Sequence, residues 1–135
     1  MQDGIEGHVG PAEEEHAERG VLRGASLGAP NRNSLCLPAV MRFNLEAAAS
    51  HYARLASLFS ASAGEMPQAE AAARSLTDVE SLIGRIGIAC GLRNHGVPRE
   101  SLGPLSAKAF EDSCHKTNIR ACTQSDLLRL YEESW

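Results

Sequence analysis

The residues best suited to chemistry lie near the end of the chain, in the stretch EDSCHKTNIRACTQSD. It contains Cys114, His115 and Cys122, whose side chains are of the types that bind zinc. Zinc sites normally use close pairs of ligands, whereas the two cysteines are separated by seven residues and the histidine is adjacent to the first of them. The spacing therefore favours a connector between two helices over a metal site.

Other candidate residues have simpler interpretations as parts of helices and turns. His51 lies beside the apolar stripe of a predicted helix, and His95 lies in the predicted turn NHGVPRE. Gly84, Gly87 and Gly91 suggest a phosphate-binding loop, but they interrupt a helical pattern instead of following a strand. We therefore expect the first two glycines to let another helix approach closely and the third to end its own helix. Spacing alone assigns no catalytic, cofactor-binding or metal-binding residue.

The composition predicts one all-α domain. A chain of 135 residues with 43% hydrophobic residues is long enough for one modest core. Aromatic residues make up only 4%, so Leu, Ile, Val and Ala must fill that core, as they do in packed helices.

Charge and hydropathy exclude several classes of partner. The net charge is −4, so the chain lacks the basic field that binds nucleic acid. No apolar run approaches the roughly 18 residues that span a bilayer, and the N-terminus lacks the pattern of a secretion signal. We expect a soluble, cytoplasmic protein whose four cysteines are reduced thiols, with no nucleic acid or membrane partner.

The charges divide the chain into two unequal parts. Residues 1–20 hold six acidic residues against Arg19 alone, so they carry −5 and leave +1 for the remainder. This first part has few large apolar residues, and PAEEEHAERGVL supports at most a short frayed helix. We predict a loosely ordered segment over residues 1–33 and a helical domain over residues 34–135.

The helical domain has a regular helical pattern from residue 34 onward. The stretch SLCLPAVMRFN is apolar and ends at Asn44, which is also suited to cap the helix that follows. Three further patterns predict helices at residues 45–60, 68–92 and 102–114. Thr123 and Asp126 have the spacing of a capping box, so a last helix is expected from about Gln124. The expected architecture is a bundle of four or five helices.

Three stretches of this domain resemble, in order and spacing, the end of an iron-containing alcohol dehydrogenase: LCLPAVMRFNLEAAASHYARLA, CGLRNHGVPRESL and DSCHKTNIRACTQSDLLRLYEESW. Members of that family usually read LPxVxRFN at the start of this region and TNPRPxTxxD near its end. Ile119 and Ala121 stand here in place of the two prolines. The resemblance implies the helical C-terminal domain of a two-domain oxidoreductase, whose other domain is an N-terminal nucleotide-binding α/β half.

The resemblance also implies iron or zinc and NAD(P) as the cofactors of the whole enzyme. The family holds its metal with an Asp and three His residues, the last of them in a Pro-His-Gly turn before the LP motif. Asn31 occupies that His position here, after Pro30. His16 lies 15 residues earlier, near the family's spacing between its two later His ligands, but its surroundings differ from the family pattern. No counterpart of the early ligands or of the Gly-rich dinucleotide segment is present, so no cofactor is expected in this chain.

Two functions from different classes follow. The first is a fragment of an oxidoreductase that interconverts alcohols and carbonyls, inactive alone, arising from a truncated gene, a shifted reading frame or a wrong gene boundary. The second is a small helical interaction module without catalysis. The expected partners are a missing N-terminal nucleotide-binding domain or a second copy of the chain, because a domain that resembles half an enzyme exposes apolar surface.

Overall fold

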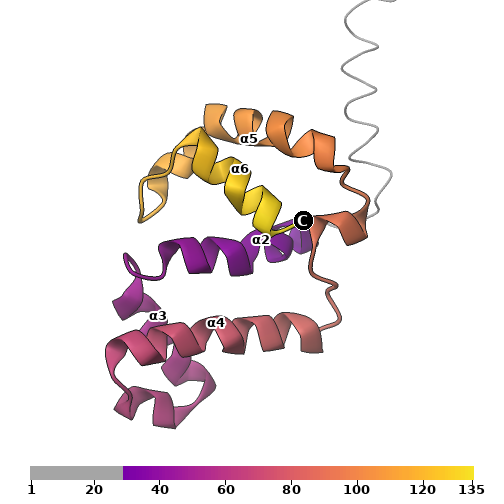
Figure 1. The fold of residues 1–135 in the computed structure, drawn as a ribbon. Helices are drawn as coiled ribbons and strands as arrows, with labels where there is room; N and C mark the ends of the chain where they lie inside the picture. Colours follow the sequence, from indigo (N-terminus) through magenta and orange to yellow (C-terminus); the bar gives the residue numbers. More distant parts are fainter. Residues whose placement is uncertain (1–28) are drawn as a thin grey trace, which may run out of the picture.

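The computed structural model describes residues 29–135, with side chains from residue 34 onward. Its α-helices, labelled as in Figure 1, are α2 (Ala29–Asn44), α3 (Ala49–Phe59), α4 (Gln68–Arg85), α5 (Leu102–Glu111) and α6 (Gln124–Glu133). Short 3-10 helices join them: η1 (Ala61–Glu65), η2 (Leu92–His95), η3 (Arg99–Ser101) and η4 (Ser113–Thr117). Within these residues there is no strand, so the predicted all-α fold is confirmed there.

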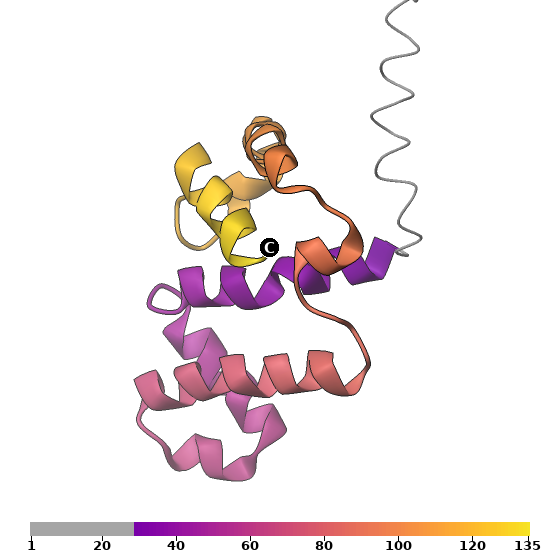
Figure 2. The same ribbon diagram turned by 45° about the vertical axis from the view of Figure 1, so that its right-hand side comes forward.

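Helix α2 lies between two helical pairs. Figures 1 and 2 show α3 and α4 on one side of it and α5 and α6 on the other. Met41 of α2 packs with Val79 of α4, whereas Phe43 packs with Leu130 of α6. A helix that is buried on two sides needs apolar residues around most of its circumference. The apolar run at residues 35–43 therefore shows no single helical stripe, although it forms a helix.

Helices α3 and α4 form an antiparallel hairpin that is packed through small side chains. Ala56 is fully buried in α3, and Ala72 and Ser75 of α4 are 1% and 0% exposed. The Ser75 hydroxyl donates to the carbonyl of Ala72 at 2.7 Å, so no polar group of this side chain is left unsatisfied. The predicted apolar stripe of α3 is confirmed in part: Tyr52 and Leu55 are half-buried and Ala56 is buried, whereas Phe59 of the same stripe is 40% exposed.

The start of α3 differs from the prediction. Asn44 was expected to cap a helix from residue 45, but it is the last residue of α2, and α3 begins at Ala49 after Ala48. The Asn44 side chain bonds to Asn118, far along the chain, instead of to the backbone of the next helix.

The end of α4 also differs, because the helix stops at Arg85 instead of near Gly91. Gly87 has φ +79°, and the N–H groups of Gly87 and Ile88 donate to the carbonyls of Gly84 and Ile83 at 3.1 and 3.2 Å. This is the hydrogen-bond pattern of a Schellman motif, in which a glycine ends the helix. The prediction of close helix approach at these glycines was wrong, because an added Cβ at Gly84 or Gly87 meets no atom within 4 Å.

The helical pattern of residues 68–92 places Ile86 and Cys90 on the apolar face, and that of residues 102–114 places Phe110 there. The structure differs: α4 ends early, so Ile86 is 62% exposed and Cys90 is exposed in the connection to η2. In α5 the buried residues are Leu102 and Ser106, whereas Phe110 is 39% exposed.

The capping box at the start of α6 is confirmed. Thr123 Oγ1 accepts from the N–H of Asp126 at 3.2 Å, and the Asp126 carboxylate accepts from the N–H of Thr123 at 2.9 Å. The hydrogen bonds that the carboxylate accepts from the N–H and the hydroxyl of Thr123 lower the pKa of Asp126. Helix α6 buries Leu130 most fully, with Leu127, Leu128 and Tyr131 half-buried around it.

None of the helices within residues 29–135 combines the length and the apolar character required to cross a membrane.

Replacement of Ala56 by leucine tests the close packing of the α3–α4 hairpin. We expect Ala56→Leu to lower the free energy of unfolding by about 1–3 kcal/mol, because no space exists for three more carbons at a fully buried site. The matched control is Ala73→Leu on the exposed face of α4, which should change stability by less than about 0.5 kcal/mol. Urea denaturation followed by far-UV circular dichroism measures both, and equal stability of the two variants would contradict the close packing.

Candidate functional site

The three segments that resemble the dehydrogenase family meet in space, although they are far apart in the sequence. Leu35 of α2, Leu92 of η2 and Leu102 of α5 form one buried cluster. Residues from the third segment pack against it: Leu128, Tyr131 and Trp135. The conspicuous sequence motifs therefore build one structural unit around α2.

A reciprocal pair of side-chain amides joins the first segment to the third. Asn44, which is 5% exposed, donates from Nδ2 to Oδ1 of Asn118 at 2.8 Å, and Asn118 donates from Nδ2 to Oδ1 of Asn44 at 2.8 Å. The Asn118 amide also donates to the carbonyl of Arg120 at 2.7 Å. Because a buried amide that lacks partners is costly, this pairing favours one position of the connector on α2.

Arg120 closes the same junction. Its Nη1 donates to the carbonyl of Phe43 at 2.8 Å, and its guanidinium carbon lies 4.1 Å from the centroid of the Phe43 ring. The carbonyl is one of the last four of α2, which have no partner within the helix, and a cation is favourable at that end. We call Phe43, Asn44, Asn118 and Arg120 together the α2 clamp.

The stretch around Cys114, His115 and Cys122 is the connector that its spacing predicts. It contains η4, and the N–H of Cys114 donates to Oδ1 of Asp112 at 2.8 Å. His115 stacks on Phe110, with ring centroids 4.7 Å apart, and its Nδ1 is hydrogen-bonded to the carbonyl of Asp112 at 2.6 Å. The imidazole therefore takes part in local structure.

The electrostatic surroundings of the cysteines disfavour reactive thiolates. A hydrogen bond to Asp112 and the charge of that carboxylate raise the pKa of Cys114. Burial, followed by the charge of Asp126, raises the pKa of Cys122, and burial raises that of Cys36. A thiol must lose its proton to bind a metal or act as a nucleophile, so these groups are poor candidates for either role. All four cysteines are unpaired.

The remaining histidines of the described part lie apart from one another. His51 is exposed on α3, as expected. His95 was expected to be a solvated loop residue, but it lies half-buried in η2, and its Nε2 is hydrogen-bonded to the carbonyl of Ala89 at 2.5 Å. His16 lies outside the described residues, as does the segment 1–28, and Asn31 lies in α2, where only the backbone is described.

The described residues do not fit the divalent metal that the family resemblance implies. Across residues 29–135 no group of three or more His, Cys, Asp or Glu side chains is arranged to hold a metal ion. No chemical step is therefore derived through a metal for this part of the chain.

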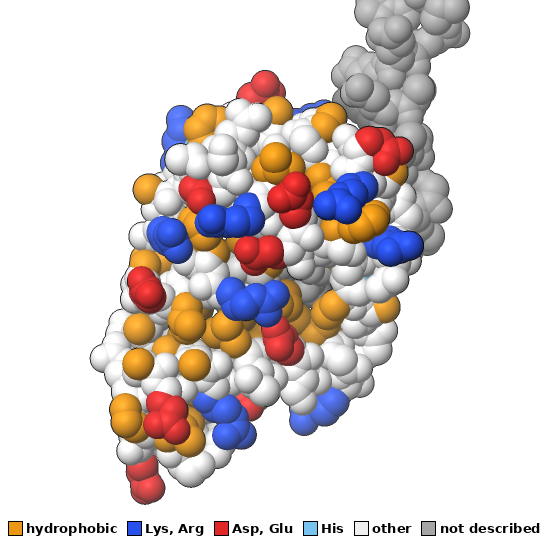
Figure 3. All heavy atoms as spheres, viewed as in Figure 1, with side chains coloured by type: hydrophobic (Ala, Val, Ile, Leu, Met, Phe, Trp, Pro, Cys, Tyr) orange, Lys and Arg blue, Asp and Glu red, His pale blue; other side chains and the backbone are white. Residues whose placement is uncertain are grey.

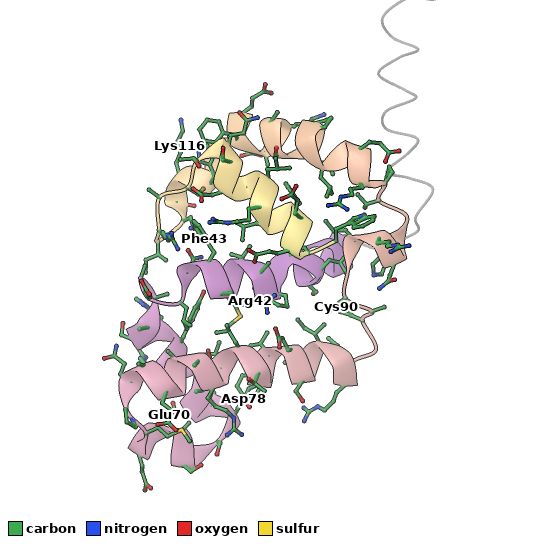
Figure 4. All side chains as sticks on the ribbon, in the orientation of Figure 1. Arg42, Phe43, Glu70, Asp78, Cys90 and Lys116 are labelled. Atoms are coloured by element: carbon green, nitrogen blue, oxygen red, sulfur yellow. The ribbon has the colours of Figure 1, made fainter. Side chains whose placement is uncertain are left out.

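One open hollow of the surface lies between α2, α4 and the residues after α6, with a volume of about 390 Å³. Leu35 and Pro38 line it on the α2 side, and Arg42 reaches from α2 to Glu80 of α4, with 2.6 Å between Nη1 and Oε1. Figure 4 shows Arg42 about midway along the space between the two helices and Cys90 at its right-hand end, in the connection that follows α4. On this face, acidic and basic side chains alternate among apolar ones, so no field of a single sign marks a binding site (Figure 3).

A second junction binds the residues after α6 to η2. The N–H of Leu92 donates to the carbonyl of Ser134 at 2.7 Å, and the indole of Trp135 donates to the carbonyl of Val97 at 2.9 Å. The guanidinium carbons of Arg93 and Arg99 lie 5.2 and 5.3 Å from the Trp135 ring. These contacts fix the indole and bring two cations to it.

Comparison with known protein families identifies the unit. The sequence profile described as "Fe-containing alcohol dehydrogenase family, C-terminal" matches residues 28–135, which include all the helices described above. This chain belongs to the iron-containing alcohol dehydrogenase family. The resemblance that the three segments indicated is thereby confirmed.

Curated relatives in the dehydrogenase family match about three quarters of this chain. The NAD-dependent methanol dehydrogenase of Bacillus methanolicus is 31% identical over 102 residues, and the 4-hydroxybutyrate dehydrogenase of Cupriavidus necator is 33% identical over 106 residues. The lactaldehyde reductase of Escherichia coli (strain K12) is 31% identical over 103 residues. The matched region covers 76% of this chain and only 26–27% of each relative, so the chain spans about a quarter of their length.

A solved dehydrogenase structure has the same arrangement of helices. The crystal structure of a 1,3-propanediol oxidoreductase superposes with a TM-score of 0.77, at 24% sequence identity, and the match covers 89% of this chain and 32% of that chain. At this identity the likeness shows the fold alone.

The α2 clamp is the feature that sequence analysis missed. Asn44 and Asn118 were both within quoted motifs, but they were interpreted as a helix cap and as part of an unstructured connector. The available signal was that each asparagine stands in one of the motifs that carry the family resemblance. Their pairing across 74 residues is not visible in any local pattern.

Removal of either amide tests the α2 clamp. We expect Asn44→Ala and Asn118→Ala each to lower the free energy of unfolding by about 1–3 kcal/mol, because each removes both bonds of the amide pair and leaves polar atoms of the partner unsatisfied. The double variant should be less destabilised than the sum of the two, since the second truncation removes a group that is already unpaired. Lys116→Ala, an exposed change in the same connector, is the control. Additive losses in urea denaturation would show that the amides do not act as a pair.

Proposed function

We propose that this chain supplies the C-terminal helical part of an iron-containing alcohol dehydrogenase-type oxidoreductase and is inactive alone. The observation that carries the proposal is the family match over residues 28–135, combined with the quarter of the relatives' length that the chain spans. The relatives are named for methanol, lactaldehyde and 4-hydroxybutyrate. Their shared chemistry is the interconversion of an alcohol and a carbonyl, which we assign to the whole enzyme and not to this chain.

The requirements of hydride transfer support inactivity of the isolated chain. The nicotinamide must be held within reaction distance of a substrate oxygen that a metal polarises. The described residues do not fit a divalent metal, and Asn31 stands at the position of the family's last His ligand. An expected role for this part is to complete and stabilise a fold whose dinucleotide and metal contacts come from other residues. We expect the cytoplasm as its compartment.

An activity assay tests this proposal directly. Supplied with iron or zinc, NAD or NADP and a panel of short alcohols, the purified chain should give no turnover above that of an unrelated protein, because one histidine cannot hold a catalytic ion alone. His16→Ala should behave identically. Metal-dependent turnover that survives further purification and disappears in His16→Ala would overturn the proposal.

Exposed apolar side chains favour a partner surface on the α3–α4 hairpin. Leu58 is 82% exposed and Ile86 is 62% exposed. His51, Arg54, Leu55 and Leu58, spaced at i, i+3, i+4 and i+7 along α3, line an open hollow of about 410 Å³. This surface supports both the missing-domain proposal and the alternative of a helical interaction module.

Self-association distinguishes the two candidates and tests the exposed surface. We expect the chain to form reversible oligomers at high concentration, and Leu58→Glu to shift the distribution towards monomer without loss of helix, because that side chain contributes little to the core. Thr77→Glu, at an exposed position of α4, adds the same charge as a control. Sedimentation velocity measures the distribution. A monodisperse, cooperatively unfolding wild-type monomer would favour an independent module.

A further inference from the structure

The open hollow between α2, α4 and the residues after α6 has an apolar floor. Leu35, Pro38 and Ala39 of α2 line it, and all three are buried by the rest of the chain. Trp135 lines it as well, and the exposed Cys90 lies at the right-hand end of this space in Figure 4. We call this space the α2–α4 hollow.

The polar side chains that line the α2–α4 hollow, other than the Cys90 thiol, have partners within the chain. Four contacts account for them: Arg42 with Glu80, Ser134 with the carbonyl of Leu130, Trp135 with the carbonyl of Val97, and Glu133 with Arg129. A site for a small polar ligand needs a few convergent polar groups that are free to bind it. The α2–α4 hollow is therefore better suited to an apolar side chain.

The α2–α4 hollow lies near the end of α2 at which the rest of the enzyme joins in the relatives. The profile of the family's C-terminal part matches from residue 28, next to the start of α2 at Ala29, and the chain spans about a quarter of the relatives' length. Leu35 is six residues from Ala29, which is about 9 Å of helix. The exposed face of α3, in contrast, follows the far end of α2.

We propose that the α2–α4 hollow receives an apolar side chain from a second polypeptide, one that carries the N-terminal part of an iron-containing alcohol dehydrogenase. This inference rests on the proposed function and adds to it the place of contact. The buried floor of α2 is preformed, so an incoming side chain gains apolar contacts without a rearrangement of the helices. Arg42 and Glu80 stay paired beside it, because an apolar side chain does not compete for either of them.

Protection of Cys90 from alkylation tests the place of contact. The probe is the lactaldehyde reductase of Escherichia coli (strain K12) without the 103 residues that this chain matches, co-expressed with the full chain. In the purified complex, N-ethylmaleimide should alkylate Cys90 about ten-fold more slowly than in the chain alone, because the partner covers the thiol. Cys114, which is also exposed but lies in η4, is the internal control and should react at an unchanged rate.

A matched pair of variants tests whether this contact contributes to binding. Cys90→Arg places a long charged side chain at the rim of the α2–α4 hollow, and Cys114→Arg makes the same change at the other exposed cysteine. With the folding of both checked by circular dichroism, Cys90→Arg should reduce the co-purified partner about five-fold or more, and Cys114→Arg should leave it unchanged.

The possible outcomes separate this inference from the function on which it rests. A complex in which Cys90 stays reactive and Cys90→Arg has no effect would overturn the inference and leave the proposed function standing. Failure of the two polypeptides to associate at all would count against both. Protection of Cys90 in the chain alone at high concentration would also overturn the inference, because the α2–α4 hollow would then bind a second copy.

Discussion

The fold depends on a polar contact between residues that are 74 positions apart. Asn44 and Asn118 satisfy each other's amides, and Arg120 binds the carbonyl and ring of Phe43 beside them. An apolar core tolerates sliding of one helix on another, whereas a buried amide pair is satisfied in one register only. The α2 clamp thus selects the position at which the connector and α6 lie against α2. The apolar clusters on both sides of α2 then add stability without needing to specify that register.

Sequence analysis succeeded where the interacting residues are neighbours in the chain and failed where they are far apart in it. The capping box of Thr123 and Asp126 lies within four residues, so its spacing alone predicted the start of α6. The end of α4 is also set by local residues, but more than one glycine in this stretch could have ended the helix. Only the backbone shows that Gly87 adopts the left-handed conformation and completes the terminal hydrogen bonds. Asn44 had a valid local interpretation as a cap. In the structure its side chain is instead hydrogen-bonded to Asn118, a partner that no local pattern reveals.

The candidate site shows the same division. The spacing of Cys114, His115 and Cys122 correctly predicted a connector, and the structure adds that Asp112 organises its first turn. The family motifs contain the residues that join the elements of this part of the chain. Their role here is structural, because their contacts hold α2, η2 and α6 together.

The arrangement of the α3–α4 hairpin bears on the order in which the chain folds. Its two helices meet across the short connection at residues 60–67, whereas the α2 clamp must close a loop of 74 residues. Chain entropy makes the longer closure about 2 kcal/mol more costly when nothing else is formed. A hairpin that forms first would shorten the flexible path between Asn44 and Asn118, because residues 49–85 are about half of the chain between them. The local, alanine-lined contact would thereby lower the entropic cost of closing the distant polar contact.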